Sequence, residues 1–183
     1  MLVGMNFSET AISGVYIVEI EYTEDERGFF ARTWDENLCA ERGLHPSHMV
    51  QCSTSFNKSR GTLRGMHYQE SPHAEAKVVR CTRGAMYDVA VDLRPDSPTY
   101  TKWVAVELTA DNRRALYIPE GCAHGFQTLT DATEVLYMMS AYYRQEASSG
   151  VRYDDPVFAI KWPEIPPRFI SIKDRSWPDW KKA

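Results

Sequence analysis

The chain has few cysteines, no long apolar segment and no excess of basic residues, and each absence excludes a class of protein. Its four cysteines are scattered over 183 residues without a Cys-x-x-Cys pair, so we expect buried, reduced thiols rather than a disulfide framework. No run approaches the roughly 18 consecutive apolar residues of a membrane helix, and we expect no secretory signal. The net charge of −4 offers no bulk attraction for nucleic acid. These features favour a cytoplasmic protein that binds neither membrane nor nucleic acid.

Length and composition predict one globular domain that is rich in β-structure. A chain of 183 residues, 43% hydrophobic and 25% charged, is long enough to bury a core as a single domain, residues 1–183. Short runs rich in Val, Ile, Tyr and Trp are separated by turn sequences, and several alternate apolar with polar residues. The expected strands are residues 15–22, 76–82, 86–93, 103–108 and 134–139. Their spacing of roughly ten residues is typical of a sandwich or barrel.

One helix is expected in this β-rich chain, over residues 36–42. Asp35 is placed to cap its start, and Gly43 is placed to end it in a left-handed conformation. The segment after Pro156 is rich in proline and tryptophan, so we expect it to wrap the barrel as irregular chain and short turns. The sequence therefore predicts an all-β barrel with one or two short peripheral helices.

Two glycine-containing segments, each ending in a histidine, carry most of the functional information. Residues 61–67 read Gly-x5-His and end at His67, and residues 119–124 read Pro-x-Gly-x2-His and end at His124. These spacings resemble the two halves of a cupin, a small jelly-roll β-barrel whose inner wall holds polar residues. We therefore expect a functional site inside the barrel, built around either a metal ion or an acid/base pair.

A metal site is the first alternative for this interior. Metal-binding cupins carry His-x-His, then a Glu and a distant His, whereas here Gln69 stands at the second position and Glu is missing from the carboxylate positions. His67, His73 and His124 could still meet, and three imidazoles bind catalytic zinc in other proteins. The ammonium group of Lys77 would repel a cation. We therefore predict that no metal is bound.

Acid/base chemistry is the second alternative. A histidine in a polar barrel suits a general base, because the unperturbed histidine pKa of about 6.5 lies near neutral pH. Arg64, His67 and Lys77 lie on two consecutive strand-like segments. If these strands pair, the three side chains can point into one cavity. Tyr137 lies in another expected strand and supplies a phenol as the acid.

The chain resembles the dTDP-4-dehydrorhamnose 3,5-epimerases, a family of cupins, nearly from end to end. Any one matching segment is a weak signal, because glycine-rich turns are common. Eight segments match in order and with consistent separations: residues 25–30 (DERGFF), 61–69 (GTLRGMHYQ), 76–100, 118–129 (IPEGCAHGFQTL), 136–137 (LY), 142–143 (YY), 154–156 (DDP) and 171–174 (SIKD). Together they are specific to the family.

The resemblance implies roles for residues that are spread along the chain. It implies His67 as the catalytic base, with Asp174 as the carboxylate that forms a dyad with it. Tyr137 matches the general acid, and Lys77 matches a lysine near the oxygen on sugar carbon 4. The positions that the resemblance assigns to binding of a nucleotide sugar are Arg27, Gln51, Arg64, His124, Tyr142 and Glu146.

The implied reaction is cofactor-independent epimerisation of a nucleotide-linked 4-keto-6-deoxyhexose, with dTDP-4-dehydro-6-deoxyglucose as the expected substrate. The keto group acidifies the C–H bonds at C3 and C5, so proton removal gives an enolate and protonation of the opposite face inverts the centre. Ser53 stands where the family usually carries Asn near the nucleobase, which leaves the base open. Epimerisation at C3 or C5 alone, a CDP- or GDP-linked sugar, a non-catalytic sugar-nucleotide-binding protein and a metal-dependent cupin stay open as alternatives.

The resemblance also implies a homodimer. There is a physical reason for one, because an unpaired β-edge at the side of an open barrel is best covered by a partner strand. Residues 27–30, near the N-terminus, are then expected to complete the site of the neighbouring subunit.

Overall fold

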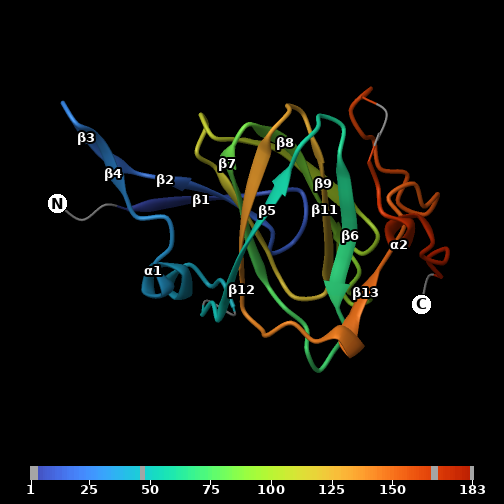
Figure 1. The fold of residues 1–183 in the computed structure, drawn as a ribbon. Helices are drawn as coiled ribbons and strands as arrows, with labels where there is room; N and C mark the ends of the chain where they lie inside the picture. The colour runs from blue at the N-terminus through green and yellow to red at the C-terminus, as the bar shows by residue number, and fades with distance from the viewer. Residues whose placement is uncertain (1–3, 46–47, 166–168, 182–183) are drawn as a thin grey trace.

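A computed structural model describes residues 4–45, 48–165 and 169–181 of the chain. Two antiparallel sheets face each other as a jelly roll, which confirms the predicted fold class (Figure 1). The six-stranded sheet has the order β1 (Met5–Glu9), β2 (Tyr16–Ile20), β10 (Ala115–Ile118), β7 (Lys77–Arg83), β12 (Thr133–Met139) and β5 (Gln51–Asn57). The five-stranded sheet has the order β13 (Ser148–Gly150), β6 (Leu63–Gln69), β11 (Cys122–Thr128), β8 (Ala85–Asp92) and β9 (Trp103–Thr109).

Four of the five predicted strands are found with small shifts at their ends, as β7, β8, β9 and β12. The predicted run 15–22 is instead divided between β2 and β3 (Tyr22–Asp25). β3 leaves the six-stranded sheet and pairs with β4 (Gly28–Ala31) in a separate hairpin. This hairpin projects from the barrel on the side of the N-terminus (Figure 1).

The predicted helix is α1 (Glu36–Glu41), and both of its predicted end signals are confirmed. The side chain of Asp35 accepts hydrogen bonds from two backbone N–H groups of the first turn. Gly43 has a φ of +77°, the left-handed conformation in which glycine ends a helix. A short second helix, α2 (Ile172–Arg175), lies in the C-terminal segment. No helix in the described part of the chain is long and apolar enough to cross a membrane.

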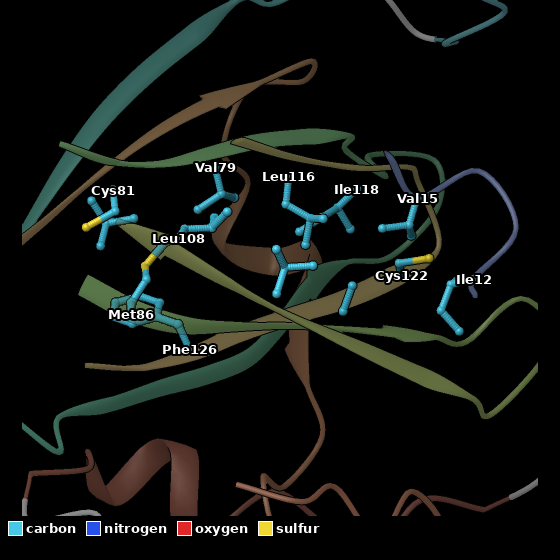
Figure 2. Close-up of a cluster of buried hydrophobic side chains, with 13 residues drawn as sticks. Ile12, Val15, Val79, Cys81, Met86, Leu108, Leu116, Ile118, Cys122 and Phe126 are labelled. Atoms are coloured by element: carbon cyan, nitrogen blue, oxygen red, sulfur yellow. The ribbon is translucent and has the colours of Figure 1, made fainter. Parts of the chain in front are cut away.

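Three apolar clusters hold the elements together. The largest fills the space between the two sheets and is drawn in Figure 2. Its large members, such as Leu108, Leu116 and Phe126, are at most 1% exposed, and each contributes about 1.5–3 kcal/mol by burial. A second cluster packs α1 against the outer face of the six-stranded sheet, around Tyr117. A third packs the C-terminal segment on the outer face of the other sheet, around Phe158.

All four cysteines are free thiols, as predicted. Cys39 lies in the cluster under α1, and Cys81 and Cys122 lie between the sheets. Burial raises the pKa of Cys39 to about 11, that of Cys81 to about 11 and that of Cys122 to about 12, because a thiolate there would lose its hydration. The expectation that all four are buried is wrong for Cys52, which is exposed because it lies on β5, an edge strand of its sheet.

Polar side chains interrupt the cluster between the sheets. Cys122 and Phe126 on β11 belong to that cluster, and His124 lies between them in the strand. Because side chains two positions apart share a face of a strand, His124 points into the barrel. Asp88 on β8 lies in the same way between two members of the cluster. The alternation therefore places a histidine and a carboxylate inside an otherwise apolar interior.

Candidate active site

A cavity of about 240 Å³ opens between the two sheets, and five residues predicted from the sequence to act in the site line it. Strands β5, β7 and β12 supply one wall, and β6 and β11 supply the other. The lining residues are Ser55, Arg64, His67, Lys77, His124, Phe126 and Tyr137.

The strands that carry Arg64 and His67 on one side and Lys77 on the other do not pair, so the condition stated for bringing the three together is not met. β6 lies between β13 and β11, and β7 lies between β10 and β12 in the other sheet. The three side chains nevertheless line one cavity, because the sheets face each other. The Lys77 ammonium crosses between the walls and donates to the main-chain carbonyl of His67 at 3.1 Å.

His67 is paired with Asp174, the residue for which the sequence offered no spatial argument. Nε2 of His67 lies 2.7 Å from Oδ1 of Asp174, on α2. Ser171 caps α2 by accepting a hydrogen bond from the Asp174 N–H, and the Gly65 N–H donates to Oδ2 at 3.4 Å. The His67 side chain is 42% exposed and that of Asp174 is 6% exposed. The pair therefore opens toward solvent on the side of the histidine.

The surroundings of Asp174 favour its charged form. Burial acts to raise its pKa, but the hydrogen bond and charge attraction of His67 outweigh burial, helped by the Gly65 N–H and the Ser171 hydroxyl, and the pKa lies below its ordinary value. Asp174 is therefore ionised at neutral pH, with its negative charge next to the His67 ring. This arrangement suits His67 to act as a general base.

A second histidine–carboxylate pair lies on the neighbouring strands. His124 stands directly opposite His67 in the β6–β11 register, and its Nε2 lies 2.6 Å from Oδ1 of Asp88. The two side chains are 5% and 0% exposed. Burial raises the pKa of Asp88, against the attraction of His124 and Lys77. Oδ2 of Asp88 has no hydrogen-bond partner in the described part of the chain.

Lys77 is held by an ion pair with Glu75 that was not predicted from the sequence. Its ammonium lies 3.1 Å from the Glu75 carboxylate, and both side chains are 10% exposed. Gln69 also donates to Glu75, at 3.2 Å. The charge of Lys77 is thus balanced while its ammonium faces the cavity. The signal was present in the sequence, because residues two positions apart on extended chain share a face.

Tyr137 on β12 carries the phenol of the site. Its ring meets the His124 ring edge-on, with the centroids 6.0 Å apart. Burial raises the pKa of Tyr137 and Asp88 raises it further, while Arg64 and the Ser55 hydroxyl act in the opposite direction. The phenol therefore keeps its proton at neutral pH, as a general acid requires. Ser55 was not predicted, although it faces inward on β5.

Arg27 was predicted to bind substrate but does not line the cavity. It lies in the turn between β3 and β4 with its side chain 83% exposed, and its guanidinium is bound to Asp25. Phe29 and Phe30 on the same hairpin are 47% and 71% exposed. Since the hairpin projects from the barrel (Figure 1), Arg27 is held away from the cavity of its own chain.

Three further residues predicted to bind substrate also lie outside the cavity lining. Gln51 begins β5, and its side-chain carbonyl accepts a hydrogen bond from the Tyr143 N–H. Tyr142 is 63% exposed, and its main-chain carbonyl is bound by the Gln69 amide. Glu146 is exposed in a short 3-10 helix, η1 (Gln145–Ala147).

The three-histidine arrangement considered from the sequence is not formed. Nε2 of His67 and Nε2 of His124 are each bound to a carboxylate, and His73 lies in the loop between β6 and β7. Among residues 4–45, 48–165 and 169–181, no group of three or more His, Cys, Asp and Glu side chains is placed to hold a metal ion.

A protein-family model described as dTDP-4-dehydrorhamnose 3,5-epimerase matches residues 9–182. The chain belongs to this epimerase family. The dTDP-4-dehydrorhamnose 3,5-epimerase of Sinorhizobium fredii is 41% identical over 178 residues, which cover 95% of this chain and 89% of the relative. The resemblance inferred from the eight sequence segments is therefore confirmed.

Solved structures of the epimerase family share the fold. The dTDP-4-dehydrorhamnose 3,5-epimerase from Elizabethkingia anophelis superposes with a TM-score of 0.92 at 38% identity, over 96% of both chains. The Legionella pneumophila enzyme, solved with dTDP-4-keto-L-rhamnose, gives 0.86 at 37% identity over 93% of this chain and 90% of that one. A 3′-monoepimerase from Streptomyces bikiniensis, solved with dTDP-quinovose, gives 0.86 at 31% identity over 93% and 85%.

Proposed function

We propose that this protein is a cofactor-independent epimerase that inverts C3 and C5 of dTDP-4-dehydro-6-deoxyglucose. The observation that carries the proposal is the meeting of His67, Lys77 and Tyr137 in one cavity, with Asp174 bound behind His67. The Legionella relative, whose structure contains dTDP-4-keto-L-rhamnose, supports the class of substrate.

In the first step, His67 removes a proton from the carbon next to the 4-keto group. The electrons of the C–H bond move into an enolate, and negative charge develops on the oxygen at C4. Asp174 stabilises the imidazolium that results. Lys77, fixed by the His67 carbonyl and Glu75, donates to the oxyanion, and one such donor typically lowers a barrier by about 3–4 kcal/mol.

In the second step, Tyr137 donates a proton to the opposite face of the same carbon, and the centre is inverted. His67 then releases to solvent the proton taken from the substrate, and the phenolate of Tyr137 takes one from solvent before the next turnover. Nothing is oxidised or reduced, so the reaction requires no redox cofactor. The high pKa that burial gives Tyr137 makes its phenolate a strong base that recovers a proton readily.

Binding of the nucleotide sugar involves the remaining cations and the rim of the cavity. The fork of the Arg64 guanidinium suits a diphosphate, because it donates two parallel hydrogen bonds to oxyanions. His124 lies in the cavity wall, and we assign contacts farther along the substrate to Gln51, Tyr142 and Glu146.

We also propose a homodimer in which the β3–β4 hairpin of one copy reaches the cavity of the other. The hairpin exposes Phe29 and Phe30, and β5 forms an edge of the six-stranded sheet. Both features are unfavourable in an isolated chain. Arg27 would then bring a guanidinium to the neighbour's substrate, which accounts for its distance from its own cavity.

Epimerisation at C3 alone is the second candidate, because a 3′-monoepimerase shares this fold. Proton exchange in D2O separates the two activities. The protein, treated with a chelator, is mixed with dTDP-4-dehydro-6-deoxyglucose, and deuterium at each carbon is followed by NMR. We expect label at both C3 and C5. Label at C3 alone would favour the monoepimerase, and no exchange in the wild type would contradict an epimerase acting on this substrate.

Variants assign the roles of the two groups. His67→Ala should abolish exchange, while Tyr137→Phe should allow exchange on the face of His67 but prevent inversion. His73→Ala is the matched control, since His73 lies in the β6–β7 loop outside the cavity lining, and it should exchange like the wild type.

A further inference from the structure

The two members of the His67–Asp174 pair come from separate parts of the chain, so their separation must be fixed by packing. His67 lies within a five-stranded sheet, whereas Asp174 lies on a helix of four residues. Such a short helix has too few internal hydrogen bonds to hold its own position. The contacts at its two ends therefore decide where the carboxylate lies.

On the N-terminal side, α2 is tied to β6 by the main chain. The Leu63 N–H donates to the carbonyl of Phe169 at 3.0 Å, and Thr62 and Phe169 form an isolated β-bridge. The Phe169 side chain is 56% exposed. This anchor fixes where the segment leaves the sheet, and the Gly65 N–H of β6 binds Oδ2 of Asp174, but neither contact reaches the C-terminal end of α2.

On the C-terminal side, the Trp177 ring packs on Gly150. A Cβ atom at position 150 would lie 2.5 Å from both Cε2 and Nε1 of this ring, so the ring fills space that only a glycine leaves. Gly150 is the cross-strand partner of His67. The Lys173 ammonium lies 5.2 Å from the centre of the same ring. Trp177 thus touches both the strand beside His67 and the helix that carries Asp174.

The Trp177 ring is located by packing rather than by a hydrogen bond. Its Nε1 is buried and has no hydrogen-bond partner in the described part of the chain, although a buried indole N–H usually has one. Because packing alone holds this ring, a change in the volume around it is expected to move the groups that it contacts. Any loss of volume here is therefore expected to move α2.

We infer that Trp177 is a positioning residue, which sets the separation of Asp174 from His67 by filling the space over Gly150. Trp177 does not line the cavity, so it acts through the pair and not on the substrate. The inference rests on the proposed function, because that function gives the pair its catalytic task. A displacement of about 1 Å in such a group can lower a rate by roughly 100-fold.

A double-mutant cycle tests this role. Trp177→Ala is made in the wild type and in Asp174→Asn, and kcat and KM are measured with dTDP-4-dehydro-6-deoxyglucose. We expect kcat to fall roughly 10- to 100-fold in the wild type with little change in KM. In Asp174→Asn the same substitution should change kcat by less than about twofold, because the partner through which it acts has been removed. An equal fall in both backgrounds would overturn the inference.

Trp180→Ala is the matched control. Trp180 anchors the same segment, through its main-chain N–H to Asp155 at 2.7 Å and through its ring against Phe158, whereas the atoms nearest to a Cβ at position 150 belong to Trp177 and Met66. It should leave kcat close to that of the wild type. If Trp180→Ala lowers kcat as much as Trp177→Ala, the effect is one of general packing and the inference is wrong.

Two additional measurements test the positioning role if Trp177→Ala does not fold or if the protein does not act on dTDP-4-dehydro-6-deoxyglucose. Gly150→Ala places a Cβ against the intact ring, and 2.7 Å from the Met66 carbonyl on β6, and should lower kcat in the same background-dependent way. The imidazole N–H resonance of His67, identified by its change in Asp174→Asn, should change in Gly150→Ala or Trp177→Ala and persist in Trp180→Ala. This resonance needs no substrate, so an inactive wild type would contradict the proposed function alone. An unchanged resonance would contradict the positioning role.

Discussion

Two histidine–carboxylate pairs lie side by side in this barrel, and they differ in exposure rather than in geometry. The N–O distances are 2.7 Å for His67–Asp174 and 2.6 Å for His124–Asp88. The His67 side chain is 42% exposed, whereas that of His124 is 5% exposed. The pKa of Asp174 lies below its ordinary value, while burial raises that of Asp88. The same two residue types therefore suit proton transfer in one place and fixed structure in the other.

The pairs also differ in how the chain assembles them. Asp88 and His124 lie on adjacent strands of one sheet, and Asp88 is the cross-strand partner of Phe126, so the pair is diagonal on one face. Asp174 reaches His67 from the C-terminal segment, 107 residues away. The sheet itself holds His124 and Asp88 in place. The His67–Asp174 pair instead depends on packing between distant segments, such as the contact of Trp177 with Gly150.

The largest expected effect is at the exposed His67–Asp174 pair, where activity should fall much more than stability. His67→Ala should lower proton exchange by roughly 10²- to 10⁴-fold, the usual contribution of a general base. Its free energy of unfolding should fall by less than about 1 kcal/mol, since water can reach Asp174 through the space left by a half-exposed side chain. Deuterium incorporation and urea unfolding measure the two quantities. A large loss of stability would show that this pair, too, is structural.

At the buried His124–Asp88 pair, the main expected effect is a loss of stability. His124→Ala leaves the buried Asp88 carboxyl group without its hydrogen-bond partner, which typically costs about 1–3 kcal/mol and more where the group is charged. Urea unfolding of the variant measures this cost. Adding Asp88→Asn should recover part of the loss, because the uncompensated charge is then removed. A change of less than about 1 kcal/mol in His124→Ala would contradict a structural role.

The smallest expected effect is a difference in pH dependence. The pKa of Asp174 is lower in the folded protein than its ordinary 3.8, so its ionisation stabilises the fold above that value, and the contribution is lost as the pH falls toward the folded pKa. The pKa of Asp88 is raised, so its ionisation opposes folding as the pH rises. Unfolding free energies from pH 7 to pH 3 should therefore diverge from those of the wild type with opposite signs in Asp174→Asn and Asp88→Asn.

Much of the fold was predictable because the strands follow local rules. Alternation located β7, β8, β9 and β12, and the Asp35 and Gly43 signals located α1. The division of residues 15–22 was missed, because it depends on contacts outside that run. The Gly4 N–H and the Asn6 side-chain amide donate hydrogen bonds to the Glu21 carboxylate where the chain leaves the sheet. No pattern within residues 15–22 indicates these contacts.

The site was predictable in its members but not in its assembly. The sequence motifs indicated His67, Lys77 and Tyr137, which meet in one cavity. They left open whether β6 and β7 pair, because which strands share a sheet depends on long-range packing, and the two strands lie in different sheets. Asp88 was missed although its strand alternation points it toward His124. A polar residue at an inward-facing position of an apolar strand is therefore a candidate site residue, as a motif histidine is.

The distribution of thiols gives the native protein a selective labelling site. All four cysteines lie in the described part of the chain, and Cys52 is the exposed one. Alkylating reagents attack thiolates, and burial suppresses ionisation of the other three. A maleimide dye should therefore modify the folded protein at a single position. That position follows Gln51 on an edge strand, so its fluorescence tests both the proposed contact of Gln51 with substrate and the proposed association of two copies, without any engineered cysteine.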